Sequence, residues 1–134
     1  MNLKRRGTAK QKMIMTIKRL AVPLLASLIG WIFAHMSFAI PVKRLRETNT
    51  LLAFYHPKPA YPFHVLLVPK KAVASLIEFD PHDSVFLTDL YSAVQSLVEE
   101  FQLDAYRLIV NGGEYQDFPQ LHFHLISDVQ RSNV

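Results

Sequence analysis

Hydrophobic positions along the chain change their spacing several times, and each spacing predicts a different element. Apolar runs rich in branched and aromatic residues occupy 51–55, 63–68 and 106–110, and such short runs are typical of β-strands. Residues 121–126 alternate between polar and apolar side chains, which predicts a fourth strand with one buried face. Prolines at positions 57, 59 and 62 separate the first two strands and predict a rigid loop there.

A long helix is predicted between the second and third of these strands. Asp80 and Pro81 are residue types of a helix N-cap and a first helical position, so we expect the helix to start at Asp80. It should run for about twenty residues, because one apolar stripe recurs at helical spacing: Val85, Phe86, Leu90, Tyr91, Val94, Leu97, Val98 and Phe101. Strands on both sides of one long helix predict an α+β domain built on an antiparallel sheet.

The charge of the chain is concentrated at its N-terminus. Of 15 Lys and Arg residues, seven lie in residues 1–19, which contain no acid, so the remaining eight are outnumbered by the 11 acids. The basic balance therefore belongs to the tail and does not indicate a nucleic-acid groove on the folded body. Because there are 0 cysteines, disulfides and thiolate metal sites are excluded.

The candidate chemistry lies on the last predicted strand. Alternation places Gln120, His122, His124 and Ile126 on one face, with the two imidazoles about 7 Å apart. The preceding loop, 111–113, is Asn-Gly-Gly and can offer main-chain amides to an anion. Imidazole acts at neutral pH as nucleophile, acid or base, so this face suits a phosphate centre.

Two other interpretations of these histidines stay open. Two histidines on one strand face are also found as ordinary surface residues. A His-x-His pair is also a common part of a metal site, which needs a third ligand such as His64 and a fixed surrounding of hydrogen bonds. We expect a site without a metal or other cofactor.

Several segments in the same order resemble the histidine-triad (HIT) family. They are Leu52-Ala53-Phe54, then 64–71 with the sequence HVLLVPKK, 106–113 with YRLIVNGG, and 116–127 with QDFPQLHFHLIS. Ile32-Phe33 through Ile40-Pro41 is similar to the opening helix of that family. The resemblance covers about residues 30–128 and implies a sheet of about five strands, one long helix and a hydrophobic N-terminal helix.

The resemblance also implies roles for individual residues. His122 would be the nucleophile that forms the nucleotidyl-histidine, His124 would lie against the phosphate, and His64 would support the nucleophile. The nucleotide-binding positions implied near phosphate, ribose and base are Asn111, Gly112, Gln116, Asp117, Phe54, His56, Ile32 and Phe33.

Three positions depart from the family pattern. Gln120 stands where the first histidine of the motif is expected, and glutamine cannot take up a proton. His56 occupies a position where an aspartate often holds the ribose hydroxyls, and Asp117 the position of a phosphate-loop serine. An acid beside a phosphate is repulsive, so these changes bear on the substrate more than on the nucleophile.

The expected function is hydrolysis or transfer at the α-phosphate of a nucleotide conjugate, through a nucleotidyl-histidine intermediate. The alternative is a nucleotide-binding or interaction module with little turnover, and a metal-dependent hydrolase is a third interpretation. The resemblance also implies a homodimer formed through the long helix and the adjacent strand.

The apolar segment 20–42 is long enough to cross a bilayer, which takes about 20 residues. Two arguments count against a span: the basic tail would send the domain away from cytoplasmic nucleotides, and a domain starting near residue 30 leaves about ten apolar residues before it. We therefore expect a basic tail at 1–19, a hydrophobic helical extension at 20–29, the domain at 30–128 and a C-terminal tail at 129–134. A cytoplasmic location is expected, with a membrane-surface contact through residues 1–40 left open.

Overall fold

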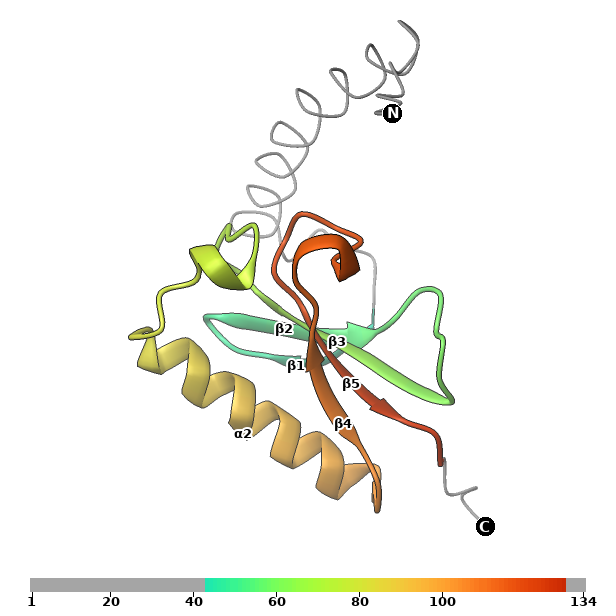
Figure 1. Cartoon of the computed structure of the whole chain (residues 1–134). Coiled ribbons are helices and arrows are strands. Elements are labelled where there is room, and N and C mark those ends of the chain that lie inside the picture. The colour runs from blue at the N-terminus through green and yellow to red at the C-terminus, as the bar shows by residue number, and fades with distance from the viewer. Residues whose placement is uncertain (1–42, 130–134) are drawn as a thin grey trace, which may run out of the picture.

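The computed structural model describes residues 43–129, which form a five-stranded antiparallel sheet with one long helix across one face (Figure 1). The strands are β1 (Arg44–Glu47), β2 (Leu51–Tyr55), β3 (Phe63–Pro69), β4 (Arg107–Val110) and β5 (Phe123–Ser127), in the spatial order β1-β2-β3-β5-β4. The helix is α2 (Ser84–Glu100), and two 3₁₀ turns, η2 (Leu76–Glu78) and η3 (Gly113–Tyr115), lie in the connections. The predicted α+β fold is confirmed; the predicted N-terminal helix lies outside the described residues.

The strand register divides the sheet into two unlike faces. Residues directly opposite one another in an antiparallel ladder share a face, and Leu67 and Phe123 are opposite one another on the face that α2 covers. That face holds the main core, which also includes Phe86, Leu90 and Leu97 of α2. The other face carries a small apolar cluster, Leu52, Phe54, Leu66 and Val68, together with two histidines, His64 and His124.

The long helix begins later than the sequence pattern predicts. Its N-cap is Asp83, whose carboxylate accepts a hydrogen bond from the Phe86 amide at 3.1 Å. The predicted cap, Asp80, instead accepts from the amide of His82 at 2.9 Å and stabilises the turn before the helix. Both aspartates have the residue type of a cap, so their local hydrogen bonds decide the boundary.

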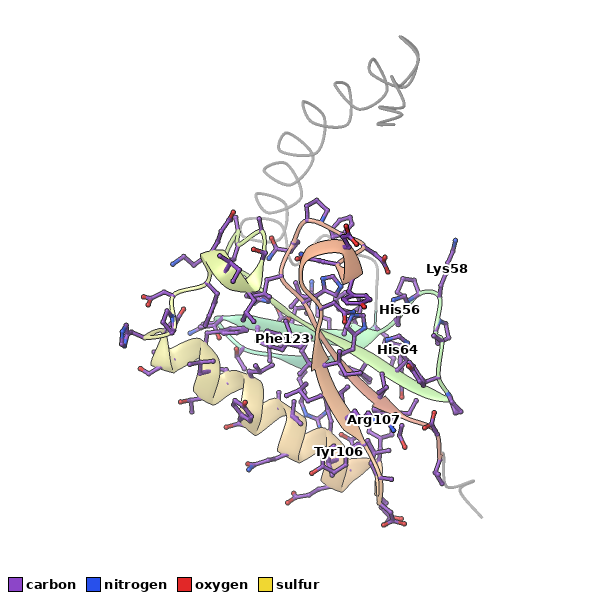
Figure 2. The ribbon with its side chains drawn as sticks, viewed as in Figure 1. His56, Lys58, His64, Tyr106, Arg107 and Phe123 are labelled. Atoms are coloured by element: carbon purple, nitrogen blue, oxygen red, sulfur yellow. The ribbon has the colours of Figure 1, made fainter. Side chains whose placement is uncertain are left out.

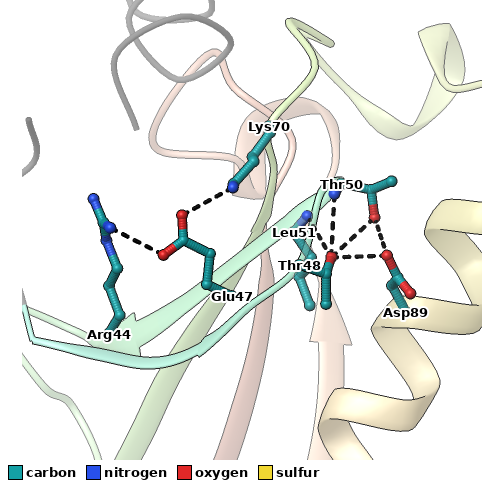
Figure 3. A network of polar contacts seen from close by, with 7 residues as sticks. All are labelled: Arg44, Glu47, Thr48, Thr50, Leu51, Lys70 and Asp89. Carbon is teal, nitrogen blue, oxygen red and sulfur yellow. Dashed lines mark hydrogen bonds and ion pairs between the residues drawn. The ribbon is translucent and has the colours of Figure 1, made fainter. Parts of the chain in front are cut away.

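β1 is a strand that the hydrophobic pattern does not reveal. It is an edge strand with charged residues, and charged side chains are common where one edge of a sheet is open. Its Glu47 pairs with Lys70 at 2.9 Å and with Arg44 at 2.9 Å, as Figure 3 shows. This strand is therefore held by ion pairs as well as by its ladder, and it has no apolar run that a sequence pattern could detect.

The turn between β1 and β2 is hydrogen-bonded to α2. Thr48 and Thr50 donate their hydroxyl hydrogens to one carboxylate oxygen of Asp89, at 2.7 and 2.6 Å (Figure 3). These hydrogen bonds lower the pKa of Asp89 from its ordinary value, because they stabilise the carboxylate. The contact fixes how the helix lies against the start of β2.

The last strand starts at Phe123 and not at Leu121 as predicted. The amide of Leu121 bonds to the carbonyl of Val73 at 2.7 Å, so this part of the chain pairs with the loop after β3 and not with the ladder. Residues 120–122 are thus an irregular segment that leads into the strand.

Between residues 43 and 129 we find no helix that is both long and apolar enough to cross a membrane; the segment 20–42 is not described.

Candidate active site

Three histidines, His56, His122 and His124, line one cavity of about 360 Å³ on the face opposite α2. Its apolar wall comes from the small cluster of that face, and its polar wall from the loop after β2, the segment before β5 and β5 itself. The lining residues are Phe54, His56, Pro57, Leu66, Val68, Asp117, Phe118, Gln120, His122 and His124. A concave, mostly apolar site with a few convergent polar groups is the usual form of a small-molecule site.

His122 carries a free ring nitrogen whose identity follows from its hydrogen bond. Its Nδ1 lies 2.6 Å from the main-chain oxygen of Gln120. A carbonyl oxygen only accepts, so the hydrogen of the neutral ring is on Nδ1 and Nε2 holds a lone pair. His122 therefore has the tautomer of a nucleophile or base.

His64 and His124 are joined by a hydrogen bond in which His64 is the donor and His124 the acceptor. The main-chain amide of Ala60 donates to Nδ1 of His64 at 3.1 Å, which leaves the hydrogen of the neutral His64 ring on Nε2. That nitrogen lies 2.9 Å from Nδ1 of His124 and donates to it, so His124 carries its own hydrogen on Nε2. His64 is 6% exposed, and burial lowers its pKa, with the neighbouring His56 adding to the effect.

The Nε2–H of His124 is buried and has no hydrogen-bond partner among residues 43–129. Burial, and after it the nearby rings of His122, His64 and His56, lower the pKa of His124 to about 4. His124 is therefore neutral at pH 7 and presents an N–H donor. A buried donor without a partner calls for an explanation, and a ligand oxygen in the adjoining cavity would supply its acceptor.

His56 continues the same face of the sheet beyond the end of β2. Its ring packs against that of His64 with centroids 4.3 Å apart, and Figure 2 shows both on the side of the sheet away from α2. Nδ1 of His56 accepts a hydrogen bond from the amide of Lys58 at 2.9 Å, so the hydrogen of the neutral ring is on Nε2. Burial, and then His122, lower the pKa of His56, while Asp117 opposes this.

His56, His64 and His124 bring one ring nitrogen each within 4.8 Å of one another, the residue set of a metal site. Metal ligation requires an imidazole lone pair, and in all three rings the lone pair on Nδ1 accepts a hydrogen bond from an N–H group. Their other nitrogens carry hydrogens. The three residues therefore present N–H groups, and a metal would have to displace main-chain hydrogen bonds to bind.

Gln120 reaches His122 through its main chain and not through its side chain. The side chain is 2% exposed, and its amide donates to the carbonyl of Lys71 at 3.1 Å and to that of Pro69 at 3.4 Å. Its Oε1 accepts from the amide of Val73 at 3.4 Å. The expected placement of Gln120 and His122 within the last strand is wrong, because β5 begins at Phe123, although both residues line the cavity.

The loop between β4 and β5 contributes fewer residues to the cavity than expected. Asp117 and Phe118 line it, whereas Asn111, Gly112 and Gln116 do not. Gln116 instead donates to the carbonyls of Ala74 and Phe118, at 2.7 Å each, and so holds the loop in place. Phe54 lies in the cavity wall as expected. Ile32 and Phe33 lie outside the described residues.

The main-chain amides of Lys58 and Ala60 are the site groups that sequence reasoning missed. They set the tautomers of His56 and His64, yet neither depends on a side chain. The prolines of the 56–62 loop are the one signal in the sequence, since they predict a rigid backbone there without saying where its amides point.

Comparisons with known proteins agree with this architecture. The family model described as HIT domain matches residues 37–131. An uncharacterized HIT-like protein from Buchnera aphidicola is 30% identical over 99 residues, which cover 71% of this chain and 88% of that protein. A HIT-like protein from Synechocystis is 32% identical over 64% of this chain and 76% of its own length.

Solved structures show the same likeness. A HIT family hydrolase from Legionella pneumophila superposes with a TM-score of 0.66 at 26% identity, covering 76% of this chain and 95% of that one. A histidine triad protein from Clostridium difficile gives a TM-score of 0.65 at 28% identity, over 77% and 94% of the two chains. Because the family model matches well over half of the sequence, and the fold and the order of the histidines agree with it, this chain belongs to the HIT family.

Proposed function

We propose that this protein binds a nucleotide conjugate in the cavity and catalyses hydrolysis or transfer at its α-phosphate through His122. The observation that supports this most directly is the distribution of ring hydrogens. His122 offers a lone pair, while His124 and His56 offer N–H groups, and all three rings line one cavity. A nucleophile beside fixed donors suits attack on a phosphorus atom whose oxygens gain negative charge.

The reaction would proceed in two displacements. Nε2 of His122 attacks phosphorus and forms an N–P bond as the bond to the leaving group breaks; the leaving group departs with the electron pair and takes a proton from water. The ring then carries a positive charge, and its Nδ1–H remains on the carbonyl of Gln120, which stabilises that charge. Water next attacks phosphorus and releases a proton to solvent, and the N–P electron pair returns to Nε2. An acceptor other than water gives transfer.

The apolar wall of the cavity would hold the base of the nucleotide. Phe54, Leu66 and Val68 project from neighbouring strands on the histidine face and line the cavity. An aromatic ring with aliphatic neighbours can stack against any base, so this wall contributes affinity without fixing which base is bound.

A covalent adduct tests the proposal. The protein is mixed with adenosine 5′-phosphoramidate, quenched within the turnover time and digested, and the peptides are examined by mass spectrometry. We expect one adenylyl group on His122 and no adduct or turnover in His122→Ala. His82→Ala is the matched control, because His82 lies on the exposed turn before α2. Undiminished turnover in His122→Ala would contradict the proposal.

A nucleotide-binding module with little turnover is the second candidate. One observation favours it: Asp117, an acid, lines the cavity where a phosphate would lie. Nucleotide binding in calorimetry without consumption of any phosphoramidate or dinucleotide would support this candidate. Activity gained on Gln120→His would then assign the loss to that position.

A further inference from the structure

We propose that the cavity selects a ligand whose reacting phosphate carries one negative charge rather than two, and that His56 is one of the two neutral donors that hold it. The inference rests on the proposed function and deepens it by naming the charge state of the substrate. It follows from the donors of the cavity, from the charges of its lining and from the way His56 is held.

His56 is a donor with a fixed direction and no formal charge. Its Nδ1 is occupied by the Lys58 amide, so Nε2–H is the group that the ring can offer to a ligand. The ring is held by packing on His64, at 4.3 Å between centroids, and lies stacked 6.1 Å from His124. His56 and His124 thus supply two N–H groups from neighbouring, roughly parallel rings.

The lining contains no lysine or arginine among the described residues, and it contains one carboxylate, Asp117. Lys58 follows His56 closely in sequence, but Figure 2 shows its side chain extending away from the domain. Lys70 directly follows β3, the strand of Leu66 and Val68, and is paired with Glu47 at 2.9 Å. The described lining therefore has a formal charge of minus one.

This balance penalises a second negative charge on the ligand. Two neutral N–H groups can each satisfy one phosphoryl oxygen, which suits an ester or amidate with a single charge. A second charge would be desolvated without a cation to compensate, and Asp117 would repel it. The same argument disfavours nucleoside diphosphates and triphosphates.

The preference for a single negative charge on the ligand would also favour release of the product. Hydrolysis of a singly charged conjugate gives a phosphate monoester, whose second ionisation has a pKa of about 6. At neutral pH the product therefore carries one charge more than the substrate. The cavity that accepts the substrate would repel the product.

A matched pair of ligands isolates the charge. The methyl ester of AMP and AMP itself are nearly equal in size, but at a pH of about 7.5 they carry one and two charges on phosphorus. Isothermal titration calorimetry of the full chain should give a Kd for the methyl ester about tenfold below that for AMP. ADP should bind more weakly than AMP.

Three variants connect this preference to the residues. Asp117→Asn should bring the two Kd values several-fold closer, while Glu99→Gln, the same charge change on the exposed side of α2, should leave their ratio unchanged. His56→Phe keeps a ring against His64 but removes the donor, and should weaken binding of the methyl ester about tenfold.

The outcomes separate this inference from the proposed function. AMP bound as tightly as its methyl ester, or a ratio unmoved by Asp117→Asn, would overturn the inference even if an adduct on His122 is found. Absence of both the adduct and any nucleotide binding would overturn the proposed function and this inference together.

Discussion

His64 and His124 form a pair of imidazoles in which the position of each hydrogen is set by the amide of Ala60. Nε2 of His64 donates to Nδ1 of His124 at 2.9 Å because the Ala60 amide, at 3.1 Å, occupies the other nitrogen of His64. The hydrogen bonds thus run from Ala60 to His64 and from His64 to His124, and they end at the buried Nε2–H of His124. A loop amide thus decides which atom His124 presents to the cavity.

Replacing His64 should therefore disturb His124 rather than His122. In His64→Phe, Nδ1 of His124 loses its donor, so the ring can place its hydrogen on either nitrogen. We expect turnover to fall about tenfold or more, since one oriented hydrogen bond to the substrate is lost for part of the population. His64→Gln, which can both accept and donate, should retain more activity than His64→Phe.

Long-range ¹H–¹⁵N spectra of the imidazoles give a readout that a general loss of structure would not imitate. The wild type should show His124 protonated at Nε2, and His64→Phe should show a mixture of tautomers at His124 with His122 unchanged. A single, unaltered tautomer at His124 in His64→Phe would refute the role assigned to His64.

Stability should decrease as the pH falls from about 6.5 towards about 4. Burial and the neighbouring imidazoles lower the pKa of His124 from 6.5 to about 4, and the pKa values of His56 and His64 are also lowered. Between these limits the unfolded chain binds more protons than the folded one, so the stabilisation is present above 6.5 and is lost with acidification. Urea midpoints at several pH values measure this.

His124→Asn removes the group with the largest of these shifts and should flatten the slope of stability against pH; the same slope in this variant would contradict the assignment. Glu47 and Asp89 add to acid destabilisation only at lower pH. Their carboxyl pKa values lie below the ordinary value, so their stabilisation is lost as the pH falls through the folded-state values.

The side chain of Gln120 should matter for stability as well as for the site. Gln120→Ala leaves the carbonyls of Pro69 and Lys71 and the amide of Val73 without their partner, and it opens space at a side chain that is 2% exposed. We expect a loss of about 2–3 kcal/mol in the free energy of unfolding. Gln95→Ala, on the exposed surface of α2, should cost less than about 0.5 kcal/mol. Equal effects of the two substitutions would show that the buried hydrogen bonds contribute nothing.

The contact between Asp89 and the β1–β2 turn gives a prediction away from the cavity. Asp89→Ala removes the acceptor of two threonine hydroxyls and should lower the free energy of unfolding by about 1–2 kcal/mol. Nucleotide binding should be unchanged, because the contact lies between α2 and the turn at the start of β2. Glu99→Ala is the control on the same helix. A loss of binding that exceeds the loss of stability would contradict the separation of the two regions.

The sequence predicted the central elements of this fold because their apolar residues are regularly spaced. The helical stripe around Leu90 and Leu97 and the runs that became β2 and β3 were recognisable for this reason. β1 was not predicted, since a charged edge strand has no apolar run to detect. The helix start was placed at Asp80 because two aspartates of equal capping ability lie three residues apart.

For the site, alternation correctly put His124 and Ile126 on one face of the last strand, whereas His64 and Phe54 were implied only by the resemblance to the HIT family. It did not predict the start of the strand, because Leu121 pairs with Val73 and the regular strand begins two residues later than the pattern implies. The sequence also could not assign the tautomers. These depend on amides whose directions are set by the three-dimensional course of the loop.

The 56–62 loop sets the tautomers of two imidazoles through main-chain N–H groups, which every amino acid except proline possesses. Substitutions at Lys58 and Ala60 should consequently pass almost unnoticed by the chemistry, whatever side chain they introduce, until a proline deletes the N–H itself. Mutational scans that rely on alanine would therefore overlook two positions whose amides set the tautomers of His56, His64 and His124.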